Sequence, residues 1–204
     1  MTIYDLKPRF QNLLKPITRL LAQKGVTANT VTIAAILLSA LGGFCAYLAK
    51  NNHLWLLFVP IILFVRMALN AIDGMLAREH NMQSNLGAIL NELGDVISDV
   101  VLYAPFAYLI VLSPELVLML VFLSIIIEMT GVVAVQIGAT RRYDGPFGKS
   151  DRAFLFGLVA VLLVIGFTST FWLNLLLIAC VLLSLLTIYN RAKKGLQELD
   201  QKGT

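Results

Sequence analysis

Residues 70–99 read NAIDGMLAREHNMQSNLGAILNELGDVISD, a polar stretch between long apolar segments. They contain five of the chain's twelve carboxylates, at Asp73, Glu79, Glu92, Asp95 and Asp99. Acids within membrane-like segments are costly to keep, so by default they indicate a functional site. We therefore expect this stretch to carry the site, and the apolar segments around it to form the scaffold.

The composition is typical of an integral membrane protein. Of the 204 residues, 58% are hydrophobic and only 14% are charged, and the mean hydropathy is +0.82. These values lie far outside those of soluble globular domains. Cys45 and Cys180 lie in apolar runs, which indicates neither a disulfide framework nor a zinc site. No basic stripe with interleaved aromatic residues is present, so nucleic acid is not expected as a partner.

The apolar segments predict an all-α membrane protein with six transmembrane helices. They lie at about 29–49, 54–79, 84–112, 116–141, 152–168 and 171–192. Each is near the ~20 residues that a helix needs to cross a bilayer. We expect one membrane domain over residues 1–204, with the six-helix bundle at 29–192 and a cytoplasmic tail at 193–204.

Residues 1–25 precede the bundle and have the pattern of a basic amphipathic helix. Apolar residues recur at three- and four-residue steps, with Lys and Arg between them. This pattern is typical of a helix in the membrane interface. A helix packed on the cytoplasmic face of the protein itself is the alternative.

The distribution of basic residues predicts the orientation in the membrane. Fourteen of the sixteen Lys and Arg residues fall before the first helix, at or beside the connections after helices two and four, or at the end of the last helix and in the tail. Cytoplasmic loops carry such an excess of positive charge. Both termini and the 70–99 site are therefore expected at the cytoplasmic face of a bacterial-type inner membrane.

Helix geometry places the polar residues of this stretch on two faces. On the second predicted helix, steps of three and four residues connect Asn70, Asp73 and Ala77. On the third, a four-residue spacing connects Gly87, Asn91, Asp95 and Asp99. If the two helices pack antiparallel, these faces form a pocket of oxygen ligands. Hard oxygen ligands without His or Cys favour Mg²⁺ or Mn²⁺ over Zn²⁺.

The pattern resembles the signature of the CDP-alcohol phosphotransferase family. That signature is Asp-x-x-Asp-Gly-x-x-Ala-Arg, eight residues, then Gly-x-x-x-Asp-x-x-x-Asp. Here the chain has Asn70-x-x-Asp73-Gly74-x-x-Ala77-Arg78, eight residues, then Gly87-x-x-x-Asn91-x-x-x-Asp95. The resemblance extends to the six helices and the amphipathic N-terminal helix, but Asn replaces the first and third acids.

The resemblance implies a phospholipid-synthesising reaction. A hydroxyl of a small polar alcohol would attack the phosphate of a CDP-linked lipid, usually CDP-diacylglycerol, and CMP would leave. Asp95 would be the general base, and Mg²⁺ or Mn²⁺ would be held by Asp73 and Asp95 with Asn70 and Asn91 as amide ligands. The residues implied to line the nucleotide pocket are Gly74, Ala77, Arg78 and Gly87, with Asn29 and Thr30 at the start of the first spanning helix. Family members are commonly homodimers.

The two asparagines should weaken metal binding, because an amide oxygen carries no charge. At an effective dielectric constant of ~20, one unit-charge contact at ~4 Å is worth about 4 kcal/mol per unit of metal charge before desolvation. Asp99 and Glu92 are the available compensating acids, although Asp99 lies one helical turn beyond Asp95. Three explanations are open: a natural active subgroup, a family member that has lost catalysis, or engineered substitutions that trap substrate.

The loop at residues 141–152 is a candidate anion-binding segment. It carries Arg141, Arg142, Lys149 and Arg152 among glycine and proline residues. By the resemblance, Arg142, Lys149 and Arg152 are predicted to bind an anionic acceptor such as a phosphorylated polyol. The alternative is that these charges serve only membrane orientation and contacts with lipid headgroups.

The sequence thus favours a membrane phosphotransferase that condenses a CDP-activated lipid with a small polar alcohol. One alternative is a binder of CDP-lipid or nucleotide without turnover. A small ion-coupled transporter is a third hypothesis, which predicts polar groups near the middle of the bilayer. The motif instead clusters at one end of helices two and three, which argues against transport.

Overall fold

The structure of the protein, a computed structural model, describes residues 3–202, with side chains described over residues 10–201. The expected all-α class is confirmed for these residues. The helices are α1 (Ile3–Gln23), α2 (Ala28–Leu48), α3 (Phe58–Glu79), α4 (Asn85–Tyr103), α5 (Pro114–Gln136), α6 (Lys149–Val164) and α7 (Thr170–Lys202), with 3₁₀ turns η1 (His53–Leu57) and η2 (Ala104–Tyr108). The ends of the predicted N-terminal helix and C-terminal tail, residues 1–2 and 203–204, lie outside the described residues.

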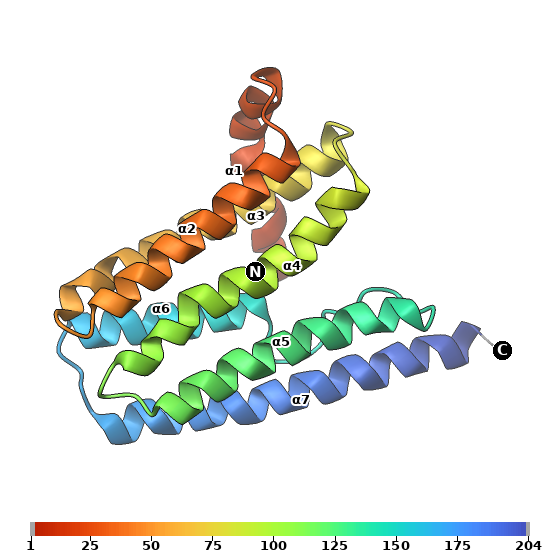
Figure 1. Cartoon of the computed structure of the whole chain (residues 1–204). Helices are drawn as coiled ribbons and strands as arrows, with labels where there is room; N and C mark the ends of the chain where they lie inside the picture. Colours follow the sequence, from red (N-terminus) through yellow and green to blue (C-terminus); the bar gives the residue numbers. More distant parts are fainter. Residues whose placement is uncertain (1–2, 203–204) are drawn as a thin grey trace.

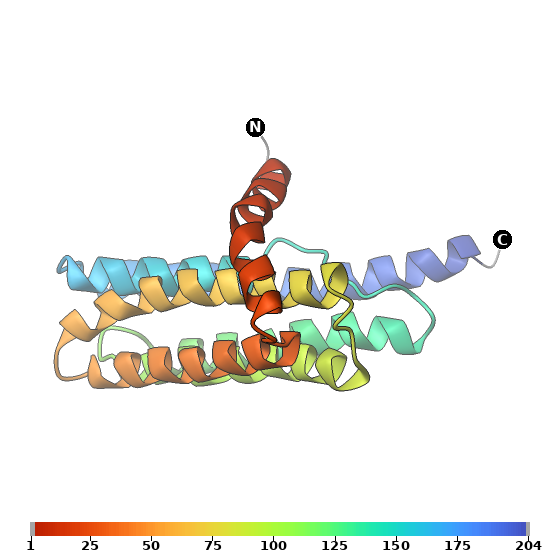
Figure 2. The same cartoon turned by 90° about the horizontal axis from the view of Figure 1, so that it is seen from above.

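Helices α2 to α7 run along a common general direction and α1 crosses them steeply (Figures 1 and 2). Within the described residues, four helical segments are long and apolar enough to cross a membrane: α2, η1 with α3, α5, and α7. Helix α4 carries Glu92, Asp95 and Asp99, and α6 has only 16 residues. The expected number of six membrane spans therefore stays a prediction for these two helices.

Several helix boundaries differ from the predicted ones for local reasons. Helix α4 ends early because Pro105, which lacks an N–H donor, diverts the chain into η2. Helix α5 ends before Gly138, whose φ of +91° suits glycine. Helix α6 begins at Lys149, where the N–H of Gly148 donates to the Asp151 carboxylate over 2.8 Å. Helix α7 continues to Lys202, so the predicted tail is helical over its described part.

Helix α2 is the centre of the first half of the bundle. It packs against both α3 and α4, while α3 also contacts α6 and α4 contacts α5. Glycines permit the close approach of α2 and α4: a Cβ at Gly43 would overlap the carbonyl oxygen of Val101, and one at Gly94 would lie 2.9 Å from Ile36. The polar faces of α3 and α4 are therefore brought together by packing on α2. The short turn suggested that α3 and α4 pack directly on each other, but their main contacts are with α2.

This packing predicts unequal effects for two glycine substitutions. Gly43→Ala is expected to lower the free energy of unfolding by about 1–3 kcal/mol, because the backbone of α4 has to move. Gly157→Ala in α6 is the control, since its Cβ would lie an ordinary 3.5 Å from Leu63. It is expected to be neutral or slightly stabilising. Thermal unfolding in detergent measures both, and equal melting temperatures would contradict the close α2–α4 contact.

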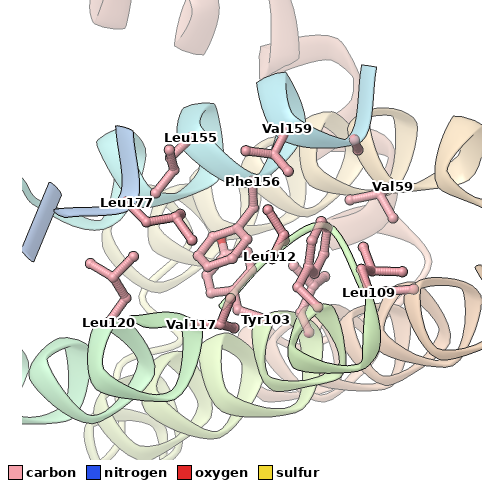
Figure 3. Packing of buried hydrophobic residues seen from close by; sticks show 14 of the residues in the cluster. Val59, Tyr103, Leu109, Leu112, Val117, Leu120, Leu155, Phe156, Val159 and Leu177 are labelled. Atoms are coloured by element: carbon pink, nitrogen blue, oxygen red, sulfur yellow. The ribbon is translucent and has the colours of Figure 1, made fainter. Parts of the chain in front are cut away.

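The apolar core lies at the end of the bundle away from the polar residues Asp73 and Asp95. It joins α2, α3 and α4 to α5, α6 and α7. Phe156 of α6 stacks on Tyr103 with 4.2 Å between ring centroids and meets the edge of Phe106 at 5.0 Å. Figure 3 shows Phe156 and Tyr103 among aliphatic side chains of α5, α6 and α7. Aromatic pairs in these geometries contribute about 0.5–1.5 kcal/mol beyond the burial of their area. The core thus fixes α4 against α6, and with them the polar ends of both helices.

Helix α1 presents two apolar faces. Leu14 and Thr18 are buried against α3, where the Thr18 hydroxyl lies 3.9 Å from the sulfur of Met75. Leu13, on the other side, is 73% exposed, and Ile17 and Leu20 are also exposed. The predicted packing on the protein is therefore present, and the remaining apolar face is free to contact lipid.

Candidate functional site

The predicted metal ligand Asp73 is buried where α2 and α3 meet. The hydroxyl of Thr32, on α2, donates a 2.9 Å hydrogen bond to its Oδ2 atom. Helix α2 is aligned here by its N-cap, since the Thr30 N–H donates to the Thr27 hydroxyl over 3.2 Å. A buried carboxylate is thus held in one orientation by a hydroxyl of the central helix.

The predicted base Asp95 lies half-buried on α4 and forms an ion pair with Lys149, the first residue of α6. Asp73 interacts electrostatically with both of these groups. Residues that are far apart in the sequence are therefore brought together by α2, α3, α4 and α6. Two carboxylates and one ammonium group form the centre of the candidate site.

The two asparagines lie on the faces predicted for them. Asn70 is half-buried and lines a groove together with Lys149 and Ser150. Asn91 is exposed on α4, one helical turn before Asp95. Asn70 thus shares a face of α3 with Asp73, and Asn91 shares a face of α4 with Asp95.

Asp99 is held differently from the other candidate ligands. Its side chain is 2% exposed, and its two oxygens accept hydrogen bonds from Arg66 at 2.7 Å and from Arg152 at 2.9 Å. A metal ion at Asp99 would have to displace one of these guanidinium groups. Its predicted role as a metal ligand stays a prediction, and its observed role is to pair α3 and α6 with α4.

The candidate nucleotide-binding residues form two neighbouring groups. On α3, the Arg78 guanidinium lies over Gly74, whose Cβ would be 3.1 Å from Nη2, and Ala77 is half-buried one residue before Arg78. Between α2 and α4, a Cβ at Gly87 would lie 2.7 Å from Oδ1 of Asn29. Thr30 is exposed beside Asn29. Both glycines thus let a polar side chain approach the helix backbone closely.

The donor set fits a hard divalent cation bound by few protein ligands. Over the described part of the chain, no three His, Cys, Asp or Glu side chains are grouped so that they could hold a metal ion. The remaining set is two carboxylates, Asp73 and Asp95, with the amides of Asn70 and Asn91. Mg²⁺ keeps several waters and is commonly bound through one or two carboxylates plus substrate phosphates. The residues therefore fit one such ion better than two.

All three cations predicted to bind the acceptor are ion-paired. Lys149 pairs with Asp95, Arg152 with Asp99 and Glu128, and Arg142 with Asp144 and Glu198 at 2.7 and 2.9 Å. Partial burial acts to raise the pKa of Asp144, but hydrogen bonds from Lys194 and Arg142 outweigh it and lower that pKa below its ordinary value. Asp144 thus remains ionised at neutral pH and holds the loop on α7.

A buried ionic cluster adjoins the site. Glu128 of α5 accepts hydrogen bonds from Arg141 at 2.9 Å, Arg152 at 3.0 Å and Arg191 at 3.2 Å. Arg141 also binds both oxygens of Glu92. We name Glu92, Asp99, Glu128, Arg66, Arg141, Arg152 and Arg191 the ionic cluster. It joins α3, α4, α5, α6 and α7.

The sequence indicated only part of this arrangement. Glu128 and Arg66 stand out because they are charged residues within apolar runs. Thr32 carries no such signal, because a hydroxyl is common in membrane helices and only the fold reveals Asp73 beside it. Arg191 reads as a basic residue at the end of the last predicted helix, next to the tail, although its side chain is almost fully buried.

An apolar groove of about 690 Å³ runs along α3 and α6 from the polar site toward the opposite end of the bundle. Its polar end is formed by Arg66, Asn70, Lys149 and Ser150. The rest is lined by Pro60, Leu63, Phe64, Met67, Ala153, Phe154, Gly157, Leu158 and Val161. The groove therefore offers a polar end at the candidate site and a long apolar wall.

The chain is similar to proteins of several organisms. It is 50% identical over 196 residues to inner membrane protein YnbA of Escherichia coli K12, covering 96% of this chain and 97% of that protein. It is 33% identical over 94 residues to archaetidylinositol phosphate synthase of Pyrococcus horikoshii, covering 46% of this chain and 47% of that protein.

Solved structures share its fold. The phosphatidylinositol phosphate synthase PgsA1 of Mycobacterium tuberculosis with CDP-DAG bound superposes with a TM-score of 0.76 at 20% identity, covering 90% of this chain and 94% of that one. Its complex with manganese and citrate gives a TM-score of 0.74 at 21% identity, covering 88% and 87% of the two chains. The family model for CDP-alcohol phosphatidyltransferase matches residues 25–194. The resemblance found in the motif is thus confirmed, and the chain belongs to the CDP-alcohol phosphatidyltransferase family.

Proposed function

We propose that this protein transfers a phosphatidyl group from a CDP-activated lipid, CDP-diacylglycerol in the first instance, to a small polar alcohol. The acceptor oxygen forms a bond to the lipid-linked phosphorus, and the bond from that phosphorus to the bridging oxygen of the diphosphate breaks. The bridging oxygen leaves with CMP and takes the bonding electron pair. The proton of the acceptor hydroxyl passes to a base on the protein.

One observation carries this proposal: the fold joins the two halves of the family motif at one end of the bundle. Asp73 on α3 interacts with Asp95 on α4 and with Lys149 on α6, and Thr32 of α2 orients it. The site also opens onto the groove between α3 and α6. A diphosphate headgroup needs such a polar end, and its lipid chains need such an apolar wall.

The roles follow from these positions. Asp95 is the proposed base, because it is half-buried and is the last acidic residue of the motif. Lys149 is placed to bind the diphosphate once Asp95 turns to the acceptor hydroxyl. Gly74, Arg78, Gly87 and Asn29 are proposed to hold the cytidine, since each glycine lets a polar side chain lie close to its helix backbone.

Asp73 and Asp95, with Asn70 and Asn91 as neutral co-ligands, would hold Mg²⁺ or Mn²⁺. When bound, such an ion supplies charge neutralisation for the diphosphate and for the departing CMP. The M. tuberculosis neighbour was crystallised with manganese, which supports this assignment. Asp99 is not proposed as a ligand, because two arginines occupy its oxygens.

The groove between α3 and α6 is proposed to take an acyl chain of the donor. From Asn70 back to Pro60, α3 rises about 15 Å, roughly half the thickness of the hydrocarbon core. Phe64, Met67 and Phe154 are exposed along this groove, so lipid can reach it from the side. An acyl chain would therefore lie parallel to those of the surrounding bilayer.

We propose an inner-membrane location with six spanning helices and both termini in the cytoplasm. Exposed apolar side chains on the outside of the bundle support it, as at Leu37, Ile61, Phe122 and Leu182. The name of the E. coli relative and the positive charges of the loops agree with it. A homodimer is proposed from the family resemblance alone.

The test is CMP release by the purified protein supplied with CDP-diacylglycerol, Mg²⁺ or Mn²⁺, and a panel of alcohols. We expect release that depends on both metal and acceptor, and a phospholipid product that contains the acceptor. CDP-diacylglycerol that binds without acceptor-dependent release would reject the proposed enzyme. That outcome would favour a protein that binds the donor without turnover, the second candidate, which the neutral Asn70 and Asn91 make plausible.

Restoring the motif acids is expected to strengthen metal dependence. In the double variant Asn70→Asp with Asn91→Asp, two added charges should lower the half-saturating concentration of Mn²⁺ by about tenfold or more. The matched control is Asn81→Asp with Asn85→Asp, which adds the same charge at the exposed turn between α3 and α4. Mn²⁺ titrations of CMP release and of metal binding check this. Equal shifts in the two double variants would show that Asn70 and Asn91 are not ligands.

A further inference from the structure

We propose that the acceptor is an uncharged alcohol, and that Glu128 excludes phosphorylated acceptors by occupying the anion position among three arginines. This inference rests on the proposed function and identifies the class of acceptor for the same site. It reverses the sequence-based expectation of a phosphorylated polyol. Glu128 is thus assigned as a specificity-determining residue, not as a catalytic one.

Three guanidinium groups converge on Glu128 from different parts of the chain. They come from the loop (Arg141), from α6 (Arg152) and from α7 (Arg191), at 2.9, 3.0 and 3.2 Å from its oxygens. Such a convergence is the geometry in which proteins bind phosphate. Here a carboxylate of the protein already fills the centre, and its side chain is 11% exposed.

The position of Glu128 matters because it adjoins the transfer site. Arg152 lies three residues after Lys149 on α6, and it connects Glu128 to Asp99. Asp99 in turn lies one helical turn from Asp95, and Arg66 reaches the Asp95 carbonyl at 3.5 Å. An acceptor whose hydroxyl lies at Asp95 would therefore have its other end near these arginines.

The other cations beside this position are also engaged. Lys149 faces Asp95 and is assigned to the donor diphosphate, and Arg66 faces Asp99. Arg142 is held by Asp144 and Glu198. An entering phosphate would have to displace a carboxylate and remain beside it, and like charges placed together at a recognition site are strongly unfavourable. A neutral polyol can instead hydrogen-bond to the outer edges of these ion pairs.

The first test compares acceptors that differ only in phosphate: glycerol with glycerol 3-phosphate, and inositol with inositol 1-phosphate. We expect CMP release to be at least about tenfold faster with the uncharged member of the productive pair. Faster release with the phosphorylated member would overturn the inference. No release with any acceptor would reject the proposed function, and the inference would then be decided by the binding test alone.

The second test measures binding without turnover. Titration calorimetry with inositol 1-phosphate and inorganic phosphate compares the wild type with Glu128→Gln, which keeps the shape of the side chain and removes its charge. Glu92→Gln is the matched control, because it also removes a carboxylate partner of Arg141 but lies outside the three-arginine position. We expect Glu128→Gln to bind phosphate at least about tenfold more tightly than both other proteins.

Phosphate binding by the wild type as tight as that by Glu128→Gln would refute the inference. Equal tightening in Glu128→Gln and Glu92→Gln would also refute it, because it would reflect overall charge only. If Glu128→Gln fails to fold, binding by the wild type alone tests the inference. Saturable binding of inositol 1-phosphate, without binding of inositol, would refute it. No binding of inositol 1-phosphate at millimolar concentration would support it.

Discussion

Replacing Asp95 by asparagine is expected to lower CMP release by at least about a hundredfold, the usual contribution of a general base. The amide cannot accept the proton of the acceptor hydroxyl, and it leaves Lys149 without its counter-charge. The fold should persist, because the ion pair is half-exposed and such pairs contribute only about 0–1 kcal/mol. CMP release and thermal unfolding, measured on the same preparation, separate the two effects.

The control for this experiment is Glu79→Gln, which neutralises an exposed carboxylate at the end of α3. It should leave both CMP release and melting temperature near those of the wild type. An Asp95→Asn protein with wild-type activity would refute the assignment of the base, even if the reaction itself were established.

Replacing Arg152 by methionine is expected to destabilise the protein by about 3–5 kcal/mol. Arg152 is 1% exposed and serves both Asp99 and Glu128, so its loss leaves buried carboxylates with fewer counter-charges. The methionine fills much of the volume but supplies no donor. Thermal or denaturant unfolding in detergent should show the loss directly.

Arg142→Met is the matched control, because Arg142 also pairs with two carboxylates but is more exposed, at 18%. Its loss should cost about 0–1 kcal/mol, as is usual for ion pairs near the surface. Equal destabilisation by the two substitutions would mean that burial of the ionic cluster does not increase its contribution to the free energy of unfolding.

The architecture could be predicted largely from hydropathy and helical spacing. Apolar segments of the right length located all six bundle helices, and the alternation before residue 25 located α1. The boundaries were less accurate where a single residue decided them. Pro105 ended α4 early, and the cap between Gly148 and Asp151 started α6 within a segment that read as loop.

Helical spacing predicts a shared face for Asp73 and Asn70 and another for Asp95 and Asn91, and both pairs lie on helices, α3 and α4. The ion pairs around them could not be predicted in the same way. Helical spacing could not show that α2 packs against both α3 and α4, because the residue pattern within one helix does not specify which helix is central in the bundle. The cations of the 141–152 loop read as free anion ligands, since all their carboxylate partners except Asp144 lie on α4, α5 and α7, up to 56 residues away in the sequence.

The pairing of α4 with α6 also affects the order in which the protein can be made. The carboxylates Asp95 and Asp99 of α4 meet Lys149 and Arg152 of α6, which follow 54 and 53 residues later. At synthesis rates of about 5–20 residues per second, roughly 3–10 s pass before these partners emerge from the ribosome. Among the ion pairs of the described side chains, α4 has Arg66 of the preceding helix as its one earlier counter-charge. The carboxylates of α4 must therefore remain partly unpaired at the membrane until α6 is made.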